Sequence, residues 1–320
     1  MLADGLERAA LGLKDSDPSV RRIAVLDVLE ISDEQAVISL LLSALRDTDA
    51  DVRAEAARAL EGFERGDVVQ ALLPLLFDTH EDVRRSAATT LAELKDPRLG
   101  DQLLPYASSP DSFARAAVLR ALRALCVPGS LAPALDALVA GDPAVRREAV
   151  SVLGYLKNPS ALEMLERVAL VDGDPAVRRA AVGALSYASD ARVVITLARA
   201  LADRSWEVRE EAAATLGRLG FGEAIPYLAD AMADDYWQVR VRCAAALGRL
   251  RAREAVPTLS RALTHAVSNL RKEAALALGE IGDAGAVPCL EQALDDPDAD
   301  VRKFAALALG KIAAGEYVRR

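Results

Sequence analysis

Residues 208–217 read VREEAAATLG, and residues 301–310 read VRKFAALALG. The Val-Arg pair that opens both stretches, or a close variant of it, recurs along the whole chain at intervals of 31 or 32 residues. Its ten arginines are Arg21, Arg53, Arg84, Arg115, Arg146, Arg178, Arg209, Arg240, Arg271 and Arg302. Such a constant interval is the signature of an internal repeat, in which each unit packs on its neighbours.

Apolar or small residues keep fixed distances from each arginine: one before it, then three, seven and ten after it. In the seventh unit they are Val208, Ala212, Leu216 and Leu219. These steps of four, four and three residues place the side chains on one face of an α-helix, so each arginine opens a helix with a single buried stripe. Another helix precedes it, as in 224–232 (AIPYLADAM), 255–263 (AVPTLSRAL) and 286–294 (AVPCLEQAL). Proline stands near the start of these three stretches, where its missing N–H costs no hydrogen bond.

Two polar or small positions also recur. An aspartate stands four residues before the arginine in six units: Asp17, Asp49, Asp111, Asp142, Asp174 and Asp298. Its side chain can accept the N–H groups at a helix start. A glycine stands eight residues after the arginine in five units: Gly154, Gly217, Gly248, Gly279 and Gly310. We interpret the glycines as points of close backbone approach, and the Asp and Arg ladder as a capping and inter-repeat pairing device.

The repeats predict an all-α fold. We expect a right-handed α-α superhelix, a solenoid of about ten helical pairs, that forms a single domain over residues 1–320. The expected repeats lie near 1–32, 33–63, 64–95, 96–126, 127–157, 158–189, 190–220, 221–251, 252–282 and 283–320.

Helical pairs of about 31 residues with the pattern VRxxAAxALG resemble the short HEAT-like repeats of the phycobilin-lyase type. The resemblance covers essentially the whole chain and implies the solenoid fold. It also implies an alternative function, a tetrapyrrole or bilin lyase-like role or that of a cofactor-assembly chaperone, in which a basic groove with tyrosines holds propionates. The residues themselves indicate no cofactor, and the same repeat serves many functions.

The composition restricts the possible partners and compartment. A net charge of −9 disfavours nucleic acid and anionic membranes as partners. Cys126, Cys243 and Cys289 stand far apart without a CxxC pair, which is typical of a reducing compartment. The first residues, MLADGLERAA, lack the apolar core of a signal peptide, and no apolar run is long enough to cross a membrane. We therefore expect a cytoplasmic protein.

Catalytic constellations are not evident in the sequence. The same repeat builds deoxyhypusine hydroxylase, in which His-Glu pairs at the two positions after the arginine equivalent hold iron. Here those positions contain glutamates, such as Glu210 and Glu211, but no histidine. The two histidines of the chain, His80 and His265, lie about six units apart and cannot share a metal ion. We expect no metal site and no enzymatic activity.

A basic face is predicted opposite the buried stripe. Positions one, five and nine residues after the arginine carry eleven basic and four acidic side chains, Arg218 and Arg249 among them. Tyr155 and Tyr187 occupy the ninth position in adjacent units. Acidic residues at the second position, where Arg242 stands in the eighth unit, reduce the basic excess.

An aromatic irregularity lies in the seventh and eighth units. Trp206 and Trp237 each stand three residues before the arginine, where other units have small residues such as Pro18, Ala50, Ser112, Pro143 and Pro175. Tyr236 replaces a capping aspartate. Because Trp, Tyr and Arg dominate interface energies, we expect a contact site here. The alternative is that both tryptophans pack locally over the loop between the helices.

We therefore predict a non-catalytic protein–protein interaction scaffold or adaptor that binds an acidic partner on its concave face. The predicted contact residues are Trp206, Tyr236, Trp237, Arg242, Arg249, Arg218, Tyr155 and Tyr187. Nucleic-acid binding, by analogy with helical-repeat DNA glycosylases, would require a more strongly basic groove.

Overall fold

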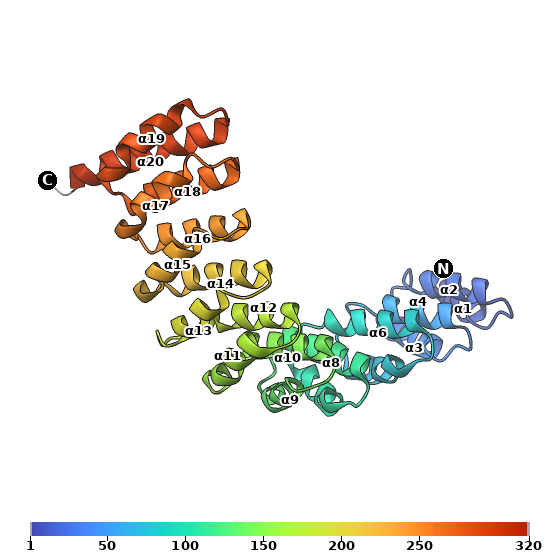
Figure 1. Cartoon of the computed structure of the whole chain (residues 1–320). Helices are drawn as coiled ribbons and strands as arrows, with labels where there is room; N and C mark the ends of the chain where they lie inside the picture. Colours follow the sequence, from blue (N-terminus) through green and yellow to red (C-terminus); the bar gives the residue numbers. More distant parts are fainter. Residues whose placement is uncertain (1, 319–320) are drawn as a thin grey trace. The chain divides into compact units, whose positions relative to one another are not determined.

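The second helix of each pair carries the Val-Arg motif, or its variant, in its first turn. A short loop joins it to the first helix of the pair (Figure 1). The computed structural model describes residues 2–318, and these residues contain helices and turns without a strand. The prediction of an all-α solenoid is thereby confirmed. The chain divides into two compact units, residues 1–156 and 157–320, which we call unit 1 and unit 2. The predicted single domain over residues 1–320 stays a prediction.

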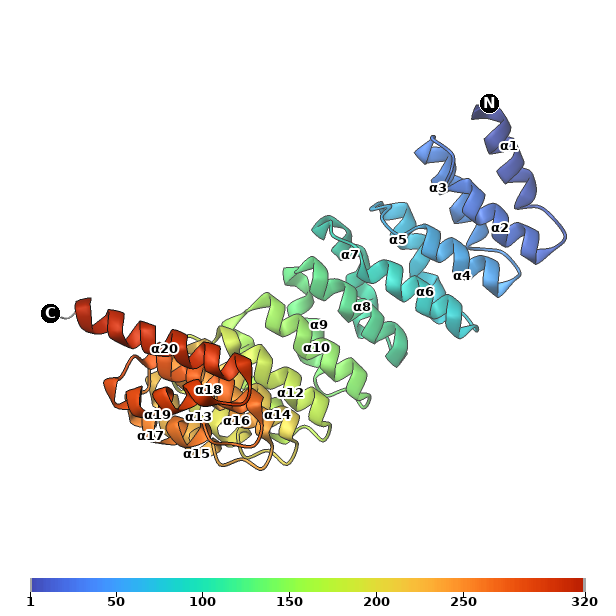
Figure 2. The same cartoon turned by 90° about the horizontal axis from the view of Figure 1, so that it is seen from above.

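Unit 1 contains ten α-helices in its described part. They are α1 (Leu2–Gly12), α2 (Pro18–Val28), α3 (Glu34–Ala44), α4 (Ala50–Ala59), α5 (Gly66–Leu72), α6 (Glu81–Ala92), α7 (Gly100–Leu103), α8 (Ser112–Leu125), α9 (Leu131–Ala137) and α10 (Pro143–Leu156). In Figure 2 the first helices α3, α5, α7 and α9 lie along one side, and the second helices α4, α6, α8 and α10 lie along the other. Each second helix packs on the second helix of the next repeat, from α2 to α10.

Unit 2 repeats this arrangement over its described residues. Its helices are α11 (Leu162–Val171), α12 (Pro175–Ala184), α13 (Val193–Ala200), α14 (Trp206–Leu219), α15 (Ile225–Ala231), α16 (Trp237–Arg249), α17 (Val256–Ala262), α18 (Ser268–Ile281), α19 (Val287–Gln292) and α20 (Ala299–Val318). Figure 1 shows α12, α14, α16 and α18 stacked in order, and each contacts the next, as α18 does α20.

Short 3₁₀ helices precede or extend many of the first helices, and one of them, η6, extends the second helix α12. They are η1 (Leu73–Phe77), η2 (Pro97–Leu99), η3 (Leu104–Ser108), η4 (Pro128–Ser130), η5 (Pro159–Ala161), η6 (Leu185–Tyr187), η7 (Gly222–Ala224), η8 (Arg253–Ala255), η9 (Ala284–Ala286) and η10 (Ala293–Asp295). Pro226, Pro257 and Pro288 stand in the first turn of α15, α17 and α19, as predicted.

The core is a row of layers, one for each repeat, rather than a single central core. The predicted stripe is buried: Val208, Ala212 and Leu216 of α14 have no exposed surface. The equivalent Val239 and Leu247 of α16 are equally buried. Because every layer is closed by its neighbours, stability is the sum of the layers and of the contacts between them.

The recurring glycines lie where second helices approach one another most closely. A Cβ atom at Gly248 would lie 2.7 Å from the Cα of Ala277 on the next second helix. Gly217 and Gly279 face Ala246 and Ala308 at 2.9 Å in the same manner. At these three positions the predicted close approach of a neighbouring backbone is confirmed.

The glycine contact can be tested with a matched pair of variants. Gly248→Ala should lower the free energy of unfolding by about 1–3 kcal/mol, because the added methyl group overlaps the backbone of α18. Gly310→Ala, at the equivalent position of α20, places its methyl group in open space and should instead stabilise the helix. Urea unfolding followed by circular dichroism measures both, and equal effects at the two positions would contradict a role for close packing at Gly248.

Candidate functional site

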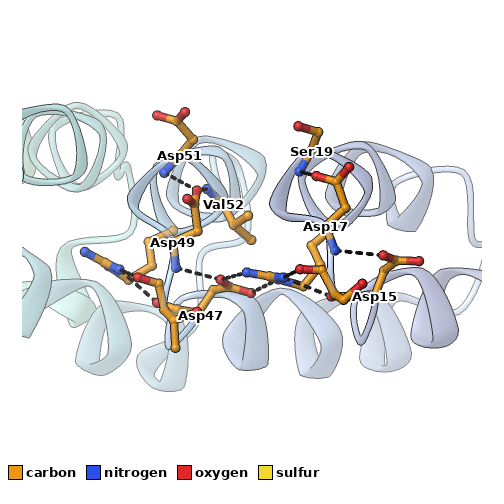
Figure 3. A network of polar contacts seen from close by, with 11 residues as sticks. Asp15, Asp17, Ser19, Asp47, Asp49, Asp51 and Val52 are labelled. Carbon is orange, nitrogen blue, oxygen red and sulfur yellow. Dashed lines mark hydrogen bonds and ion pairs between the residues drawn. The ribbon is translucent and has the colours of Figure 1, made fainter.

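Adjacent repeats are joined by an arginine that binds two loops at once. The Nε and Nη2 groups of Arg21 donate to the two carboxylate oxygens of Asp47 in the next repeat, at 2.7 and 2.8 Å. Its Nη1 group donates to the main-chain carbonyls of Asp15 and Ser16 in its own repeat. Figure 3 shows Asp47 at the centre of these contacts. We call this bidentate contact between repeats a rung.

The rung recurs along both units. Each one joins the arginine of the motif to an aspartate in the next repeat: Arg21–Asp47, Arg53–Asp78, Arg178–Asp203, Arg209–Asp234 and Arg271–Asp296. The same aspartate also accepts the N–H two residues further on, as Asp47 does from Asp49, and thereby fixes its own loop. The arginines of the predicted ladder do pair with the next repeat, but their partner is a different aspartate from the one that the sequence indicated.

Two different aspartates share this work. Asp17 and Asp49 cap the N-termini of α2 and α4, as predicted (Figure 3). The rung aspartate stands two residues earlier, six before its own repeat's arginine, and the sequence reasoning did not single it out. The signal was present in the sequence, since this position holds aspartate in seven units: Asp15, Asp47, Asp78, Asp172, Asp203, Asp234 and Asp296.

The rungs shift the pKa values of both partners. The hydrogen bond from Arg21 lowers the pKa of Asp47, and Asp47 raises the pKa of Arg21. For Asp234, burial would raise the pKa, but the hydrogen bonds from Arg209 and from the Tyr236 N–H outweigh burial and lower it. Both partners of each rung are therefore charged at neutral pH.

Acid should weaken the joints between repeats. Because the folded-state pKa of each rung aspartate lies below its unfolded value, its contribution to stability is complete above about pH 4 and is lost as the pH falls through the lowered value. We expect the melting temperature to drop steeply below pH 4. Asp296→Asn should already be less stable at neutral pH and should lose less on acidification than the wild type. Thermal melts between pH 7 and pH 3 test this, and parallel curves for the two proteins would contradict it.

A histidine replaces the rung aspartate between the eighth and ninth repeats. His265 Nε2 lies 3.2 Å from Arg240 Nη1, and its Nδ1 lies 3.1 Å from the Val267 nitrogen, which donates to it. Both ring nitrogens therefore face donors, although a neutral imidazole has a single acceptor nitrogen. This joint leaves one N–H group without an acceptor.

Replacing that histidine with the consensus aspartate should strengthen the joint. We expect His265→Asp to raise the free energy of unfolding by about 0.5–1.5 kcal/mol at pH 7, because a carboxylate accepts from both donors. Differential scanning calorimetry of the variant and the wild type measures the change. A lower melting temperature for His265→Asp would show that the imidazole fits this joint better than a carboxylate.

Three of the predicted contact residues meet in one groove of unit 2. Arg218, Arg242 and Arg249 line a cavity of about 330 Å³ together with Arg179, Glu210, Glu211, Ala214, Ala245 and Ala246, on α12, α14 and α16. We call this cavity the arginine groove. Its walls carry four arginines and two glutamates, so the balance of charge in the groove is positive.

Three of these arginines are already paired with the two glutamates, either across neighbouring helices or, for Arg218, within α14. Arg242 Nε lies 3.0 Å from Glu210, and Arg218 Nη2 lies 2.8 Å from Glu211. Arg179 approaches Glu211 at 3.9 Å. Arg249 is exposed and makes no hydrogen bond or ion pair within the part of the chain that the structure describes. The groove thus contains paired arginines beside one that is available to a partner.

A half-buried glutamate lies near the groove on α18. Burial raises the pKa of Glu273, and the charge of Glu280 raises it further, while Arg249 and Arg242 lower it. The charge of Arg249 therefore acts on Glu273 without a direct ion pair. A partner carboxylate on Arg249 would compete with this weaker interaction.

The predicted aromatic residues separate into a stack and a lone ring. Trp206 stacks on Tyr236, with ring centroids 5.6 Å apart and planes 8° from parallel. Arg209 also contacts the stack, since its guanidinium lies 5.5 Å from the Tyr236 ring centroid. Trp206 is half-buried and Tyr236 is 45% exposed. Trp237 is half-buried at the start of α16 and makes no ring contact among residues 2–318.

The two predicted tyrosines have different surroundings. Tyr155, in unit 1, is 59% exposed, and Arg123 lies 5.7 Å from its ring centroid. Tyr187, in unit 2, donates its hydroxyl hydrogen to the Asn158 carbonyl at 2.9 Å, and burial raises its pKa. The phenol of Tyr187 therefore serves an internal contact.

Neither a metal-binding cluster nor a membrane-spanning helix occurs in the described part of the chain. No group of three or more His, Cys, Asp or Glu side chains is arranged to hold a metal ion within residues 2–318. Among the same residues, no helix is both long and apolar enough to cross a membrane.

The chain belongs to the HEAT-repeat family. Models of HEAT repeats match residues 6–76, 38–123, 100–172, 131–203, 167–240 and 228–310, which together span most of the sequence. The predicted repeat class is confirmed by this match and by the helical pairs of the structure. No curated protein shows significant sequence similarity to the chain.

Solved structures show the same fold. An engineered protein from the Northeast Structural Genomics Consortium is 24% identical, with a TM-score of 0.54 over 97% of this chain and 99% of that one. YibA of E. coli is 19% identical, with a TM-score of 0.55 over 90% and 95%. Kap121p is 15% identical, with a TM-score of 0.69 over 97% of this chain and 41% of its own.

Proposed function

We propose that this HEAT-repeat protein is a non-catalytic cytoplasmic scaffold whose unit 2 binds an acidic segment of a partner protein. The observation that carries the proposal is the arginine groove, which presents four arginines and two glutamates on a chain of net charge −9. The groove lies on the second helices, which usually line the concave face of a helical solenoid. The free thiols of Cys126, Cys243 and Cys289 suit a reducing compartment.

The ion pairs in the groove hold two guanidinium groups in fixed orientations, which favours the binding of a further carboxylate. Glu210 and Glu211 hold the guanidinium groups of Arg242 and Arg218 in place. A partner carboxylate that binds Arg249 can then add a bidentate contact to one of these pre-oriented groups. Because each internal glutamate must be shared or displaced, we expect the partner to present more than one acidic residue.

The aromatic stack supplies an apolar anchor on the same helices. Trp206 and Tyr236 lie at the N-terminal ends of α14 and α16, and Trp237 is the first residue of α16. Rigid aromatic rings beside arginines are typical of interface hot spots. We include these three residues in the proposed contact surface, and we retain Tyr155 as a separate contact in unit 1.

Structural similarity supports a role in protein binding. The structures of Kap121p bound to Ste12p and to Nup53p have TM-scores of 0.68 and 0.67 with this chain. In those complexes a protein of similar fold holds a protein partner, which is the role proposed for unit 2.

Charge reversal in the groove tests the proposal. The partner should first be captured from cells of the source organism, and its affinity should then be measured with purified proteins by calorimetry. Arg242→Glu/Arg249→Glu should weaken binding about tenfold or more, because two close charge contacts become repulsive. Trp206→Ala/Trp237→Ala tests the aromatic anchor in the same way.

The control reverses an arginine outside the groove. Arg192, whose side chain is 89% exposed, pairs with Asp190 on a loop of unit 2. Arg192→Glu makes the same change of net charge as Arg249→Glu alone, which is measured beside it, and should leave the affinity within about twofold. Equal losses for the groove and control variants would show that only net charge matters and would rule out the arginine groove as the binding site.

A further inference from the structure

The rung is missing between two successive pairs of repeats in unit 1. We call a joint with a bidentate Arg–Asp contact closed and a joint without it open. Ser109 and Ala140 occupy the positions at which the closed rungs have an aspartate. The arginines that would pair with these aspartates are Arg84 and Arg115, and both are half-buried. Within residues 2–318, neither guanidinium lies within ion-pair distance of a carboxylate.

Arg84 keeps the orientation that arginines have in the closed rungs. Its Nη1 group donates to the carbonyls of Asp78 and Thr79, six and five residues earlier, as Arg53 Nη1 does to Asp47 and Thr48. Its Nε and Nη2 groups, which would hold the aspartate, have no acceptor among the described residues. The loop carbonyls therefore hold the guanidinium through its Nη1 group, while the edge formed by Nε and Nη2 has no hydrogen-bond acceptor among the described residues.

Ser109 performs one of the two tasks of a rung aspartate. Its hydroxyl accepts the Asp111 N–H at 3.2 Å, as Asp47 accepts the Asp49 N–H at 2.8 Å. The serine side chain is shorter and does not reach Arg84. The loop consequently keeps its form without supplying the carboxylate. At the next joint, Ala140 has no acceptor side chain, and Arg115 Nε turns to the Ala107 carbonyl at 3.1 Å.

One aromatic ring contacts Arg84, and two further rings adjoin the residues whose carbonyls hold the arginines. Phe113 is 39% exposed, and the Arg84 guanidinium lies 5.7 Å from its ring centroid. Phe77 is 45% exposed, precedes the Asp78 carbonyl that holds Arg84, and contacts Tyr106 at 6.3 Å between centroids. Tyr106 in turn precedes the Ala107 carbonyl that holds Arg115.

We propose that Arg84 and Arg115, with Phe77, Tyr106 and Phe113, bind an acidic segment of a partner protein that carries two carboxylates and an aromatic or apolar side chain. We call these five residues the open ladder segment. The closed rungs supply the argument, because they show that an arginine held by two loop carbonyls, as Arg84 is, binds a carboxylate in bidentate geometry. Arg115 stands at the same position of its repeat and would release the Ala107 carbonyl to bind the second carboxylate. This site lies on unit 1 and is additional to the arginine groove of unit 2.

The spacing of the arginines sets the spacing of the ligand carboxylates. Neighbouring packed helices lie about 8–10 Å apart. A peptide in the polyproline II conformation advances about 3.1 Å per residue and returns every third side chain to the same face. Acidic residues three positions apart therefore match Arg84 and Arg115. The net negative charge of the chain acts on such a peptide only at short range, since physiological salt screens charges beyond about 8 Å.

The test closes the open joints with the chain's own carboxylates. The probe is a fluorescein-labelled heptapeptide, Gly-Glu-Phe-Ser-Glu-Phe-Gly, and its binding to the full chain is followed by fluorescence anisotropy. Ser109→Asp/Ala140→Asp should raise the melting temperature and weaken peptide binding at least about tenfold, because the new aspartates occupy both arginines. Arg84→Gln/Arg115→Gln should weaken binding to the same extent, which provides a second measurement if the first variant folds poorly.

Two controls distinguish the open ladder segment from a general effect of stability and from non-specific adsorption of the peptide. His265→Asp repairs a joint in unit 2 and should leave peptide affinity unchanged. A peptide with glutamine in place of both glutamates should bind about tenfold more weakly or not at all. Unchanged affinity in Ser109→Asp/Ala140→Asp and in Arg84→Gln/Arg115→Gln would overturn the proposal. If in addition Arg242→Glu/Arg249→Glu abolished binding, the peptide would lie in the arginine groove, so the two proposals fail separately.

Discussion

The bidentate contact between an arginine and the aspartate of the next repeat is the constraint on which this structure depends. One guanidinium binds two carbonyls of its own loop and both oxygens of a neighbouring carboxylate, as Arg21 does with Asp47. Arginine suits this position because its donors form a planar fork that is always protonated, whereas lysine presents a point charge. The contact sets the register between loops, and the apolar layers then close beneath it.

A solenoid makes each such contact a local property. Because repeats contact only their neighbours, a missing rung weakens one joint and leaves the remaining layers intact. Ser109, Ala140 and His265 are three departures of this kind, each at a position where other repeats carry aspartate. They differ in consequence: the serine and alanine leave a guanidinium without a carboxylate, while the histidine places two donors opposite one ring. The fold tolerates these departures because the Val and Leu layers remain buried beneath them.

The sequence predicted the layers better than it predicted the surface. The spacing of Val208, Ala212 and Leu216 determined which face is buried, since helical periodicity fixes burial without reference to distant residues. The rung partner was missed because it lies in the next repeat, about 25 residues away, and its identity depends on how two loops meet. The prediction of a basic face also treated Arg242 as an independent charge, whereas Glu210 of the preceding second helix is paired with it.

An internal carboxylate separates the arginines that join repeats from those that we propose as the first contacts of a partner. Arg178 and Arg209 are each held by an aspartate of the next repeat, and a partner could reach them only by displacing it. Arg84 and Arg249 have no such carboxylate among the described residues, although each stands at a position that recurs in other repeats. For the half-buried Arg84, the missing counter-charge lowers stability, and an incoming carboxylate relieves that cost. We therefore expect a partner to gain binding energy where an arginine lacks the carboxylate that equivalent arginines have in other repeats.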